Sequence, residues 1–211
     1  MNTKPLKLFN ERVMRRRCFK RLTRLLKPLL VGSKNILDIG TRRGRLARSI
    51  KRETNQNFIG VDILLQNKRS IPIIKCDGRL LPFKDNTFDC VMIVDVLHHV
   101  TDPDFIIKEA ERVTKNLIVL KDHYYASKLD FTILKFFDYI SNSADGVSLP
   151  FTFMQHDQWN RMFRNNGLKI KLIERFGGTI TDLYKHVVFV LQKPKKPRFY
   201  AHVRAARANV S

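Results

Sequence analysis

Three short apolar runs decide the fold: ILDIG at 36–40, FIGVDI at 58–63 and CVMIVDVLHHV at 90–100. Each run contains an acid, since Asp38 lies within the first run, and Asp62 and Asp95 stand where the second and third strands should end. Side chains at the carboxyl ends of neighbouring parallel strands face one crevice, where open α/β sheets bind ligands. Carboxylates at that crevice suit a ligand that carries ribose hydroxyls and an amine.

The rest of the chain predicts alternating strands and helices. We expect strands at 35–39, 58–62, 71–77, 90–95, 117–121, 168–176 and 185–192, and helices at 44–54, from Pro103 onward and at 157–165. Asp102 should cap the helix at Pro103, because its side chain accepts hydrogen bonds from free first-turn amides. The last two strands flank Gly177-Gly178, which suggests an antiparallel hairpin added to a parallel sheet. An aromatic segment at 123–154 interrupts the alternation.

The positive charge is concentrated at the two ends of the chain. Of the net charge of +21, residues 1–34 carry +10 and residues 193–211 carry +6, which leaves +5 for the residues between them. We therefore expect a basic amphipathic N-terminal helix at 1–34, a nearly neutral domain at 35–192 and a basic tail at 193–211. Such ends favour anionic partners, either RNA or an acidic membrane surface, and simple solubility is the alternative.

Apolar residues between Phe9 and Leu29 recur at helical spacing, and basic residues such as Arg16 and Arg24 occupy the other faces. This pattern predicts a basic amphipathic helix that is interrupted near Pro28. Its apolar stripe either packs on the core or enters an anionic membrane interface.

Nothing in the sequence predicts a transmembrane segment or a metal site. No apolar run approaches the roughly 18 residues that span a bilayer, and the Arg-rich start lacks the apolar stretch of a secretory signal. Cys18, Cys76 and Cys90 form no C-x-x-C pair. We therefore expect a cytoplasmic protein without a metal, with peripheral attachment to a membrane as the alternative.

The first strand leads into a helix through a turn that contains Gly40 and Gly44. Such a turn places backbone amides beside the crevice, and glycine allows a ligand to approach closely. Asp62 follows Gly40 by twenty-two residues and is placed to accept hydrogen bonds from two ribose hydroxyls. These features alone also permit a nicotinamide dinucleotide.

Longer motifs are more specific than the glycine turn. ILDIGTRRGRLA, FIGVDI, CDGRLLPFKDNTFDCVMIVDVLHHV and EAERVTK, within about residues 35–122, resemble the class I S-adenosylmethionine-dependent methyltransferases. The LPF-x-D-x-x-FD-x-V stretch, followed by D-x-LHHV, is similar to the type 11 branch, which includes quinone-biosynthesis C-methyltransferases. The resemblance implies an α/β, Rossmann-like sheet of seven mostly parallel strands with an antiparallel last strand and helices on both faces. It also implies S-adenosyl-L-methionine as the cofactor.

The same resemblance implies which residues surround that cofactor. They are Asp38, Gly40, Thr41 and Gly44 at the methionine moiety, Asp62 at the ribose, Ile63, Asp77 and Gly78 at the adenine, and Asp95 and Val96 facing the methionine end and the substrate.

One residue departs from the family's first motif, D-x-G-x-G-x-G, because Arg42 stands where the middle glycine would be. Its side chain could crowd the cofactor or point outward. A non-catalytic binding protein with the same fold is therefore an alternative.

Methyl transfer from a sulfonium is an in-line displacement, which depends on alignment and on exclusion of water. A hydroxyl or acidic carbon also needs a proton acceptor. His98, His99 and His123 follow the fourth and fifth predicted strands, and His99 is our candidate catalytic base. A structural role for the histidine pair is the alternative.

Aromatic residues between His123 and Phe153 are candidates for an apolar acceptor chamber, although many should belong to the core. We therefore predict an S-adenosylmethionine-dependent methyltransferase that acts on a small, apolar or aromatic acceptor. The alternative enzyme is an RNA methyltransferase whose basic ends bind phosphates. No Asn-Pro-Pro-aromatic motif of the kind found in such enzymes follows the fourth strand.

Overall fold

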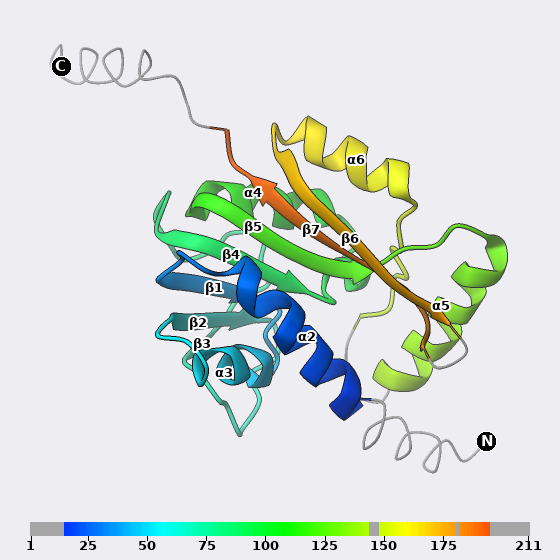
Figure 1. Cartoon of the computed structure of the whole chain (residues 1–211), viewed down its shortest axis with the longest axis horizontal. Coiled ribbons are helices and arrows are strands. Elements are labelled where there is room, and N and C mark those ends of the chain that lie inside the picture. Colours follow the sequence, from blue (N-terminus) through cyan, green and yellow to red (C-terminus); the bar gives the residue numbers. More distant parts are fainter. Residues whose placement is uncertain (1–14, 144–147, 180–181, 195–211) are drawn as a thin grey trace, which may run out of the picture.

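A seven-stranded sheet with the strand order β3-β2-β1-β4-β5-β7-β6 forms the centre of the protein (Figure 1). The computed structural model describes residues 15–143, 148–179 and 182–194. Its strands are β1 Asn35–Ile39, β2 Asn57–Asp62, β3 Ile73–Lys75, β4 Phe88–Val94, β5 Thr114–His123, β6 Lys169–Thr179 and β7 Asp182–Gln192. Strands β1 to β5 pair in parallel, whereas β7 is antiparallel to both β5 and β6. The predicted fold class, with its reversed last strand, is confirmed.

Helices cover both faces of this sheet. They are α2 Arg15–Leu29, α3 Arg45–Lys51, the short 3-10 helix η2 Leu97–His99, α4 Pro103–Val113, α5 Lys128–Asn142 and α6 His156–Asn165. Buried side chains of α2 and α3 belong to the core on one face, and those of α4 and α6 belong to the core on the other. The predicted cap of α4 is present, because the Asp102 side chain accepts a hydrogen bond from the Asp104 amide.

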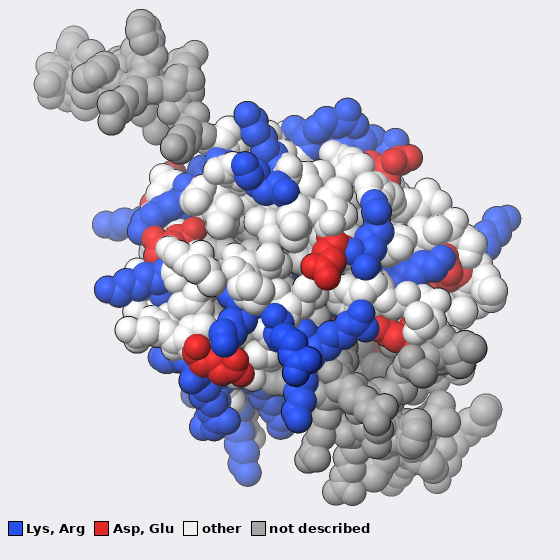
Figure 2. Space-filling view, in the orientation of Figure 1, with Lys and Arg blue, Asp and Glu red and all other residues white. Residues whose placement is uncertain are grey.

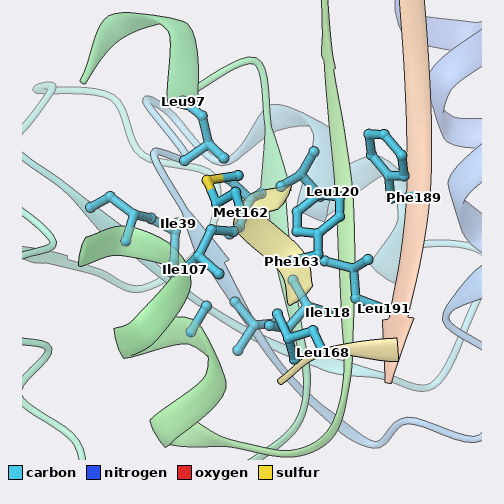
Figure 3. Packing of buried hydrophobic residues seen from close by; sticks show 14 of the residues in the cluster. Ile39, Leu97, Ile107, Ile118, Leu120, Met162, Phe163, Leu168, Phe189 and Leu191 are labelled. Atoms are coloured by element: carbon cyan, nitrogen blue, oxygen red, sulfur yellow. The ribbon is translucent and has the colours of Figure 1, made fainter. Parts of the chain in front are cut away.

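Figure 3 shows the core between the sheet and the helices α4 and α6. Phe163 of α6 and Phe189 of β7 meet edge to face with ring centroids 4.9 Å apart. Ile107 of α4 and Leu120 of β5 are fully buried in the same cluster. Strands that are covered on both faces have few polar positions, which is why their sequences are nearly continuous apolar runs.

The apolar stripe of α2 packs on the opposite face of the sheet. Leu22, Leu26 and the following Leu30 are buried in the cluster that also contains α3 side chains. The stripe therefore contributes to the core. Lys and Arg side chains spread over the surface on this side, with acidic side chains scattered between them (Figure 2). The first part of the predicted stripe, including Phe9 and Val13, lies outside the described residues, as does most of the basic tail. The helix ends at Leu29, one residue after Pro28.

Two features differ from the sequence prediction. Gly177 and Gly178 lie inside β6, at an irregularity in its pairing with β7, and not between the last two strands. A Cβ atom on Gly177 would overlap the Tyr184 carbonyl, so only glycine permits this close approach. The aromatic segment at 123–154 contains α5, a helix that the sequence analysis did not predict. Within the described ranges, no helix is long and apolar enough to cross a membrane.

Candidate functional site

Three strand-end acids lie at one edge of the sheet. Asp38 on β1 is in register with Gly60 of β2 and with Met92 of β4. Asp62 is the last residue of β2, and Asp95 directly follows β4. Because these strands are parallel neighbours, their carboxyl ends meet at the same edge, as the three apolar runs predicted.

The turn after β1 has a left-handed backbone, with φ values of 69° at Gly40, 53° at Arg42 and 67° at Gly44. The Gly40 and Thr41 amides donate to the Val61 carbonyl at 2.9 and 3.3 Å, and the Gly44 amide donates to the Thr41 carbonyl at 2.8 Å. We expected amides of this turn to face a ligand, but these three bond to the protein itself.

The two glycines also allow close packing. A Cβ atom on Gly40 would overlap the Val96 side chain, and one on Gly44 would overlap Ile71. The glycines are therefore needed for backbone conformation and for contact with neighbouring side chains. A ligand at this edge would be held mainly by the side chains around the turn.

Asp38 is buried beneath the turn, and its carboxylate accepts a hydrogen bond from the Thr41 hydroxyl. Burial raises the pKa of Asp38 to about 7, although the Thr41 hydrogen bond opposes that rise. A carboxyl with this pKa changes charge near neutral pH and would be held in its anionic form by a cationic ligand group.

Asp62 connects two segments at the edge of the sheet. Its Oδ2 atom accepts a hydrogen bond from the Arg42 amide at 2.7 Å, and its Oδ1 atom accepts one from the Leu64 amide at 2.9 Å. Each carboxylate oxygen can accept a second hydrogen bond, so these contacts leave capacity for ribose hydroxyls. Arg42 is exposed at the surface of the turn.

The residues expected at the adenine lie beside Asp62. Ile63 directly follows it and is 60% exposed. The Cys76 amide donates to the Asp62 carbonyl at 2.9 Å and so brings the exposed Asp77 and the buried Gly78 to the same end of the sheet. The structure thus brings this group together.

Asp95 has a different environment from the other two acids. Its φ value is 56°, and its Oδ1 atom lies 2.5 Å from Nζ of the buried Lys121 and 3.2 Å from Nε2 of His123. Burial raises the pKa of Asp95, but the charge of Lys121 and the contact with His123 outweigh it and hold the pKa well below its usual range. This carboxylate is already paired within the protein.

Of the two adjacent histidines, His98 has the carboxylate partner. Its Nδ1 atom lies 2.5 Å from Oδ1 of Asp122, which is fully buried at the end of β5. The other oxygen of Asp122 accepts a hydrogen bond from the Leu97 amide at 3.0 Å. Burial lowers the pKa of His98, but Asp122 more than compensates, so that the pKa rises above its usual value.

His99, our candidate base, has no carboxylate at hydrogen-bond distance among the described residues. Burial and the neighbouring His98 lower its pKa to about 4, so it is neutral at pH 7 but a weak base. Its Nε2 atom lies 3.7 Å from Oδ1 of Asp138 on α5. Phe153 stacks on the His98 ring, with ring centroids 5.0 Å apart.

Sequence reasoning missed Lys121, Asp122 and Asp138, which all contact residues after β4. Asp122 and Lys121 looked like the end of an apolar strand, and Asp138 lay in a segment with no predicted helix. One local signal could have found α5: Ser127 and Asp130 form a reciprocal capping box at its first turn.

Comparison with known proteins agrees with the sequence resemblance. Residues 37–117 match the methyltransferase domain family of type 11. The ubiquinone/menaquinone biosynthesis C-methyltransferase UbiE of Cellvibrio japonicus is 33% identical over 123 residues, which are 50% of this chain and 49% of that protein. UbiE of Ectopseudomonas oleovorans is 33% identical over 114 residues, 47% of this chain and 66% of that one. The chain thus spans about half the length, or less, of the first curated relatives that it matches.

Solved structures share the fold at low sequence identity. A possible histamine N-methyltransferase of Thermotoga maritima superposes with a TM-score of 0.63 at 22% identity, covering 84% of this chain and 89% of that one. The 1,6-didemethyltoxoflavin-N1-methyltransferase of Burkholderia thailandensis, solved with S-adenosylhomocysteine, gives a TM-score of 0.65 at 12% identity, covering 84% and 78%.

Proposed function

We propose, from the premise that residues 37–117 belong to the methyltransferase domain family, that this protein transfers a methyl group from S-adenosylmethionine to a small acceptor. The observation that carries the proposal is the pair of buried acids, Asp38 and Asp62, at the ends of two adjacent parallel strands. The cofactor has a cationic amine and a ribose, and these are the groups that the two acids suit.

The residues at the strand ends fit such a cofactor. Asp62 would bind the ribose hydroxyls with its remaining acceptor capacity, and Asp38 with Thr41 would face the methionine moiety. The exposed Ile63 would pack on the adenine, beside Asp77 and Gly78. When bound, the cofactor supplies an electrophilic methyl group on a sulfonium. The work of the protein is then to align the acceptor and to exclude water.

We place the acceptor near the ends of β4 and β5, where rings surround the histidines. Phe153 stacks on His98, and Phe131 meets Phe153 edge to face at 6.1 Å between centroids. Phe136 and Tyr139 of α5 are instead mostly exposed and face away from a core. A wall of this composition suits an apolar or aromatic acceptor, and the UbiE relatives, whose names refer to quinone biosynthesis, support an acceptor of this kind. For His99, the low pKa makes a role as general base weaker than the sequence suggested, and His98 with Asp122 is the better placed pair.

The decisive experiment is calorimetric titration of the full-length protein with S-adenosylhomocysteine, followed by transfer of labelled methyl groups to a panel of phenols, quinols and RNA. We expect one bound S-adenosylhomocysteine per chain and labelling of an aromatic small molecule. Absence of binding in folded protein would support the non-catalytic alternative, and labelling of RNA alone would support the RNA methyltransferase.

A second experiment separates acceptor binding from cofactor binding. Replacement of residues 127–143 by a short Gly-Ser linker removes α5, whose only fully buried side chain within the described helix is Leu134. Methyl transfer to the acceptor should be lost while S-adenosylhomocysteine still binds. Loss of both together with folding would show that the segment is part of the core.

A further inference from the structure

His98, His99 and Asp138 bring two imidazoles and a carboxylate close together. Oδ1 of Asp138 lies 3.8 Å from Nε2 of His98 and 3.7 Å from Nε2 of His99, and both distances exceed a hydrogen bond. Ligand atoms of the three side chains all lie within 4.8 Å of one another. Among the described residues, Oδ2 of Asp138 and Nδ1 of His99 are buried with no hydrogen-bond partner, although the His99 ring also has a hydrogen bond with the Ser148 backbone. Polar groups left in this way require an occupant or a rearrangement.

The surroundings hold these side chains in place. Asp122 contacts Nδ1 of His98 at 2.5 Å and so fixes the tautomer whose Nε2 faces Asp138. Oδ1 of Asp138 accepts a hydrogen bond from the Asn142 side chain at 2.7 Å, one turn later on α5. In metal sites, a ligating histidine typically donates its other ring N–H to a carboxylate, and ligating carboxylates are themselves hydrogen-bonded.

We propose that His98, His99 and Asp138 bind a divalent transition-metal ion of the zinc class. Two imidazole nitrogens and one carboxylate oxygen are the donor set of three-ligand zinc sites, which keep a coordination position open. With bonds of about 2.0 to 2.2 Å, ligand atoms of a tetrahedral ion lie about 3.3 to 3.5 Å apart. The observed separations from Asp138 are 3.7 and 3.8 Å, and all three ligand atoms lie within 4.8 Å of one another, so metal binding requires an inward movement of these side chains. The exposed fraction of the His99 side chain is 17%, the largest of the three, so the site opens on that side.

The position of this site gives it a role in acceptor recognition. The histidines follow β4 and Asp138 projects from the helix after β5, so the ion would lie beside the strand ends where we place the acceptor. An open coordination position would bind an acceptor oxygen, which favours a phenol or enol whose proton passes to solvent water on binding. This assignment of the acceptor class rests on the proposed function, whereas the metal site itself does not. It replaces our sequence expectation that no metal is bound, and it also replaces His98 as the base, because Nε2 of His98 would be bound to the ion and Nδ1 contacts Asp122.

The test uses full-length protein stripped with a chelator and then titrated with Co²⁺, monitored by visible absorption, and with Zn²⁺ by equilibrium dialysis. Wild-type protein should bind one ion per chain and give the visible spectrum of Co²⁺ with nitrogen ligands. Asp138→Asn and His99→Gln should each weaken binding at least about tenfold. Asp157→Asn, which removes an exposed acid from α6, is the matched control and should bind like the wild type.

Folding of each variant is checked by circular dichroism, and each sample is also titrated with S-adenosylhomocysteine. No stoichiometric binding by folded wild-type protein, or equal binding by both site variants, overturns the metal site. A water molecule would then bridge the three side chains. If the folded protein binds S-adenosylhomocysteine but neither metal ion, only this inference is refuted. If it binds a metal ion but not S-adenosylhomocysteine, only the proposed function is refuted.

Discussion

The Arg42 amide donates a hydrogen bond of 2.7 Å to Oδ2 of Asp62. Arg42, which stands where the family has a glycine, is therefore hydrogen-bonded through its backbone to Asp62, the acid that the resemblance places at the ribose. The left-handed φ of 53° at Arg42 is the conformation that glycine adopts without strain. The turn thus keeps the backbone shape of the motif although it has lost the glycine.

Asp62→Ala should weaken binding of S-adenosylhomocysteine by about 1.5 to 3 kcal/mol, because a charged hydrogen-bond acceptor for the ribose is lost. Asp62→Asn retains one acceptor oxygen and should lose less. Calorimetric titration measures both, with Asp157→Ala as the control. Wild-type affinity in a folded Asp62→Ala protein would remove the ribose assignment.

Arg42→Gly should leave the affinity for S-adenosylhomocysteine equal or improved, because the backbone amide at position 42 still donates its hydrogen bond to Asp62. Stability should change by no more than about 1 kcal/mol, since relief of the left-handed strain offsets the added freedom of glycine in the unfolded chain. Titration and chemical denaturation test this. A large loss of affinity would show that the Arg42 side chain itself holds the ligand.

Asp38 should make stability fall with rising pH in the ligand-free protein. Its folded-state pKa of about 7 lies above the ordinary value of 3.8, so the folded protein binds more protons than the unfolded chain between these values. The free energy of unfolding, compared with Asp38→Asn, should therefore decrease by up to about 4 kcal/mol from pH 4 to pH 7 and then level off. Parallel curves for the two proteins would mean that the pKa of Asp38 is the same in the folded and unfolded states.

Leu26→Ala should destabilise the protein by about 2 to 5 kcal/mol, because the side chain is fully buried between α2 and the sheet. Leu25→Ala, at a partly buried neighbouring position, should cost clearly less. Urea denaturation of both variants gives the comparison. Equally small losses of stability in both variants would show that the apolar stripe is not buried and would support its role in membrane binding.

The basic surface of α2 should bind anionic membranes by charge alone, now that its stripe is buried. Lys20→Ala/Arg24→Ala removes two exposed cations from this helix, and Lys169→Ala/Lys171→Ala removes two from β6 as a control. In co-sedimentation, phosphatidylglycerol vesicles should retain wild-type protein at low salt and phosphatidylcholine vesicles should not. The α2 variant should bind more weakly than the control. Tight, salt-dependent binding to RNA without vesicle binding would favour the RNA methyltransferase.

Local sequence patterns predicted most of the fold. The apolar runs at 36–40 and 58–63 predicted strands within one residue of β1 and β2, and the Asp102-Pro103 pair predicted the start of α4. The family motifs named residues at the ends of three strands that the structure does bring to one edge. The prediction was wrong for the segment before α6. Its aromatic composition obscured the helical spacing of α5, which begins at the capping pair Ser127 and Asp130.

By itself the sequence determined the order of strands and helices and the acids at the strand ends, because these depend on residues close together in the chain. The partners of the histidines were decided only by the tertiary structure. Asp122 lies 24 residues from His98 in the sequence. Asp138 lies on α5, which follows β5, and only the fold brings it near the histidines after β4. Which carboxylate contacts which imidazole depends on how β5 and α5 are placed by packing, and no local pattern records that placement.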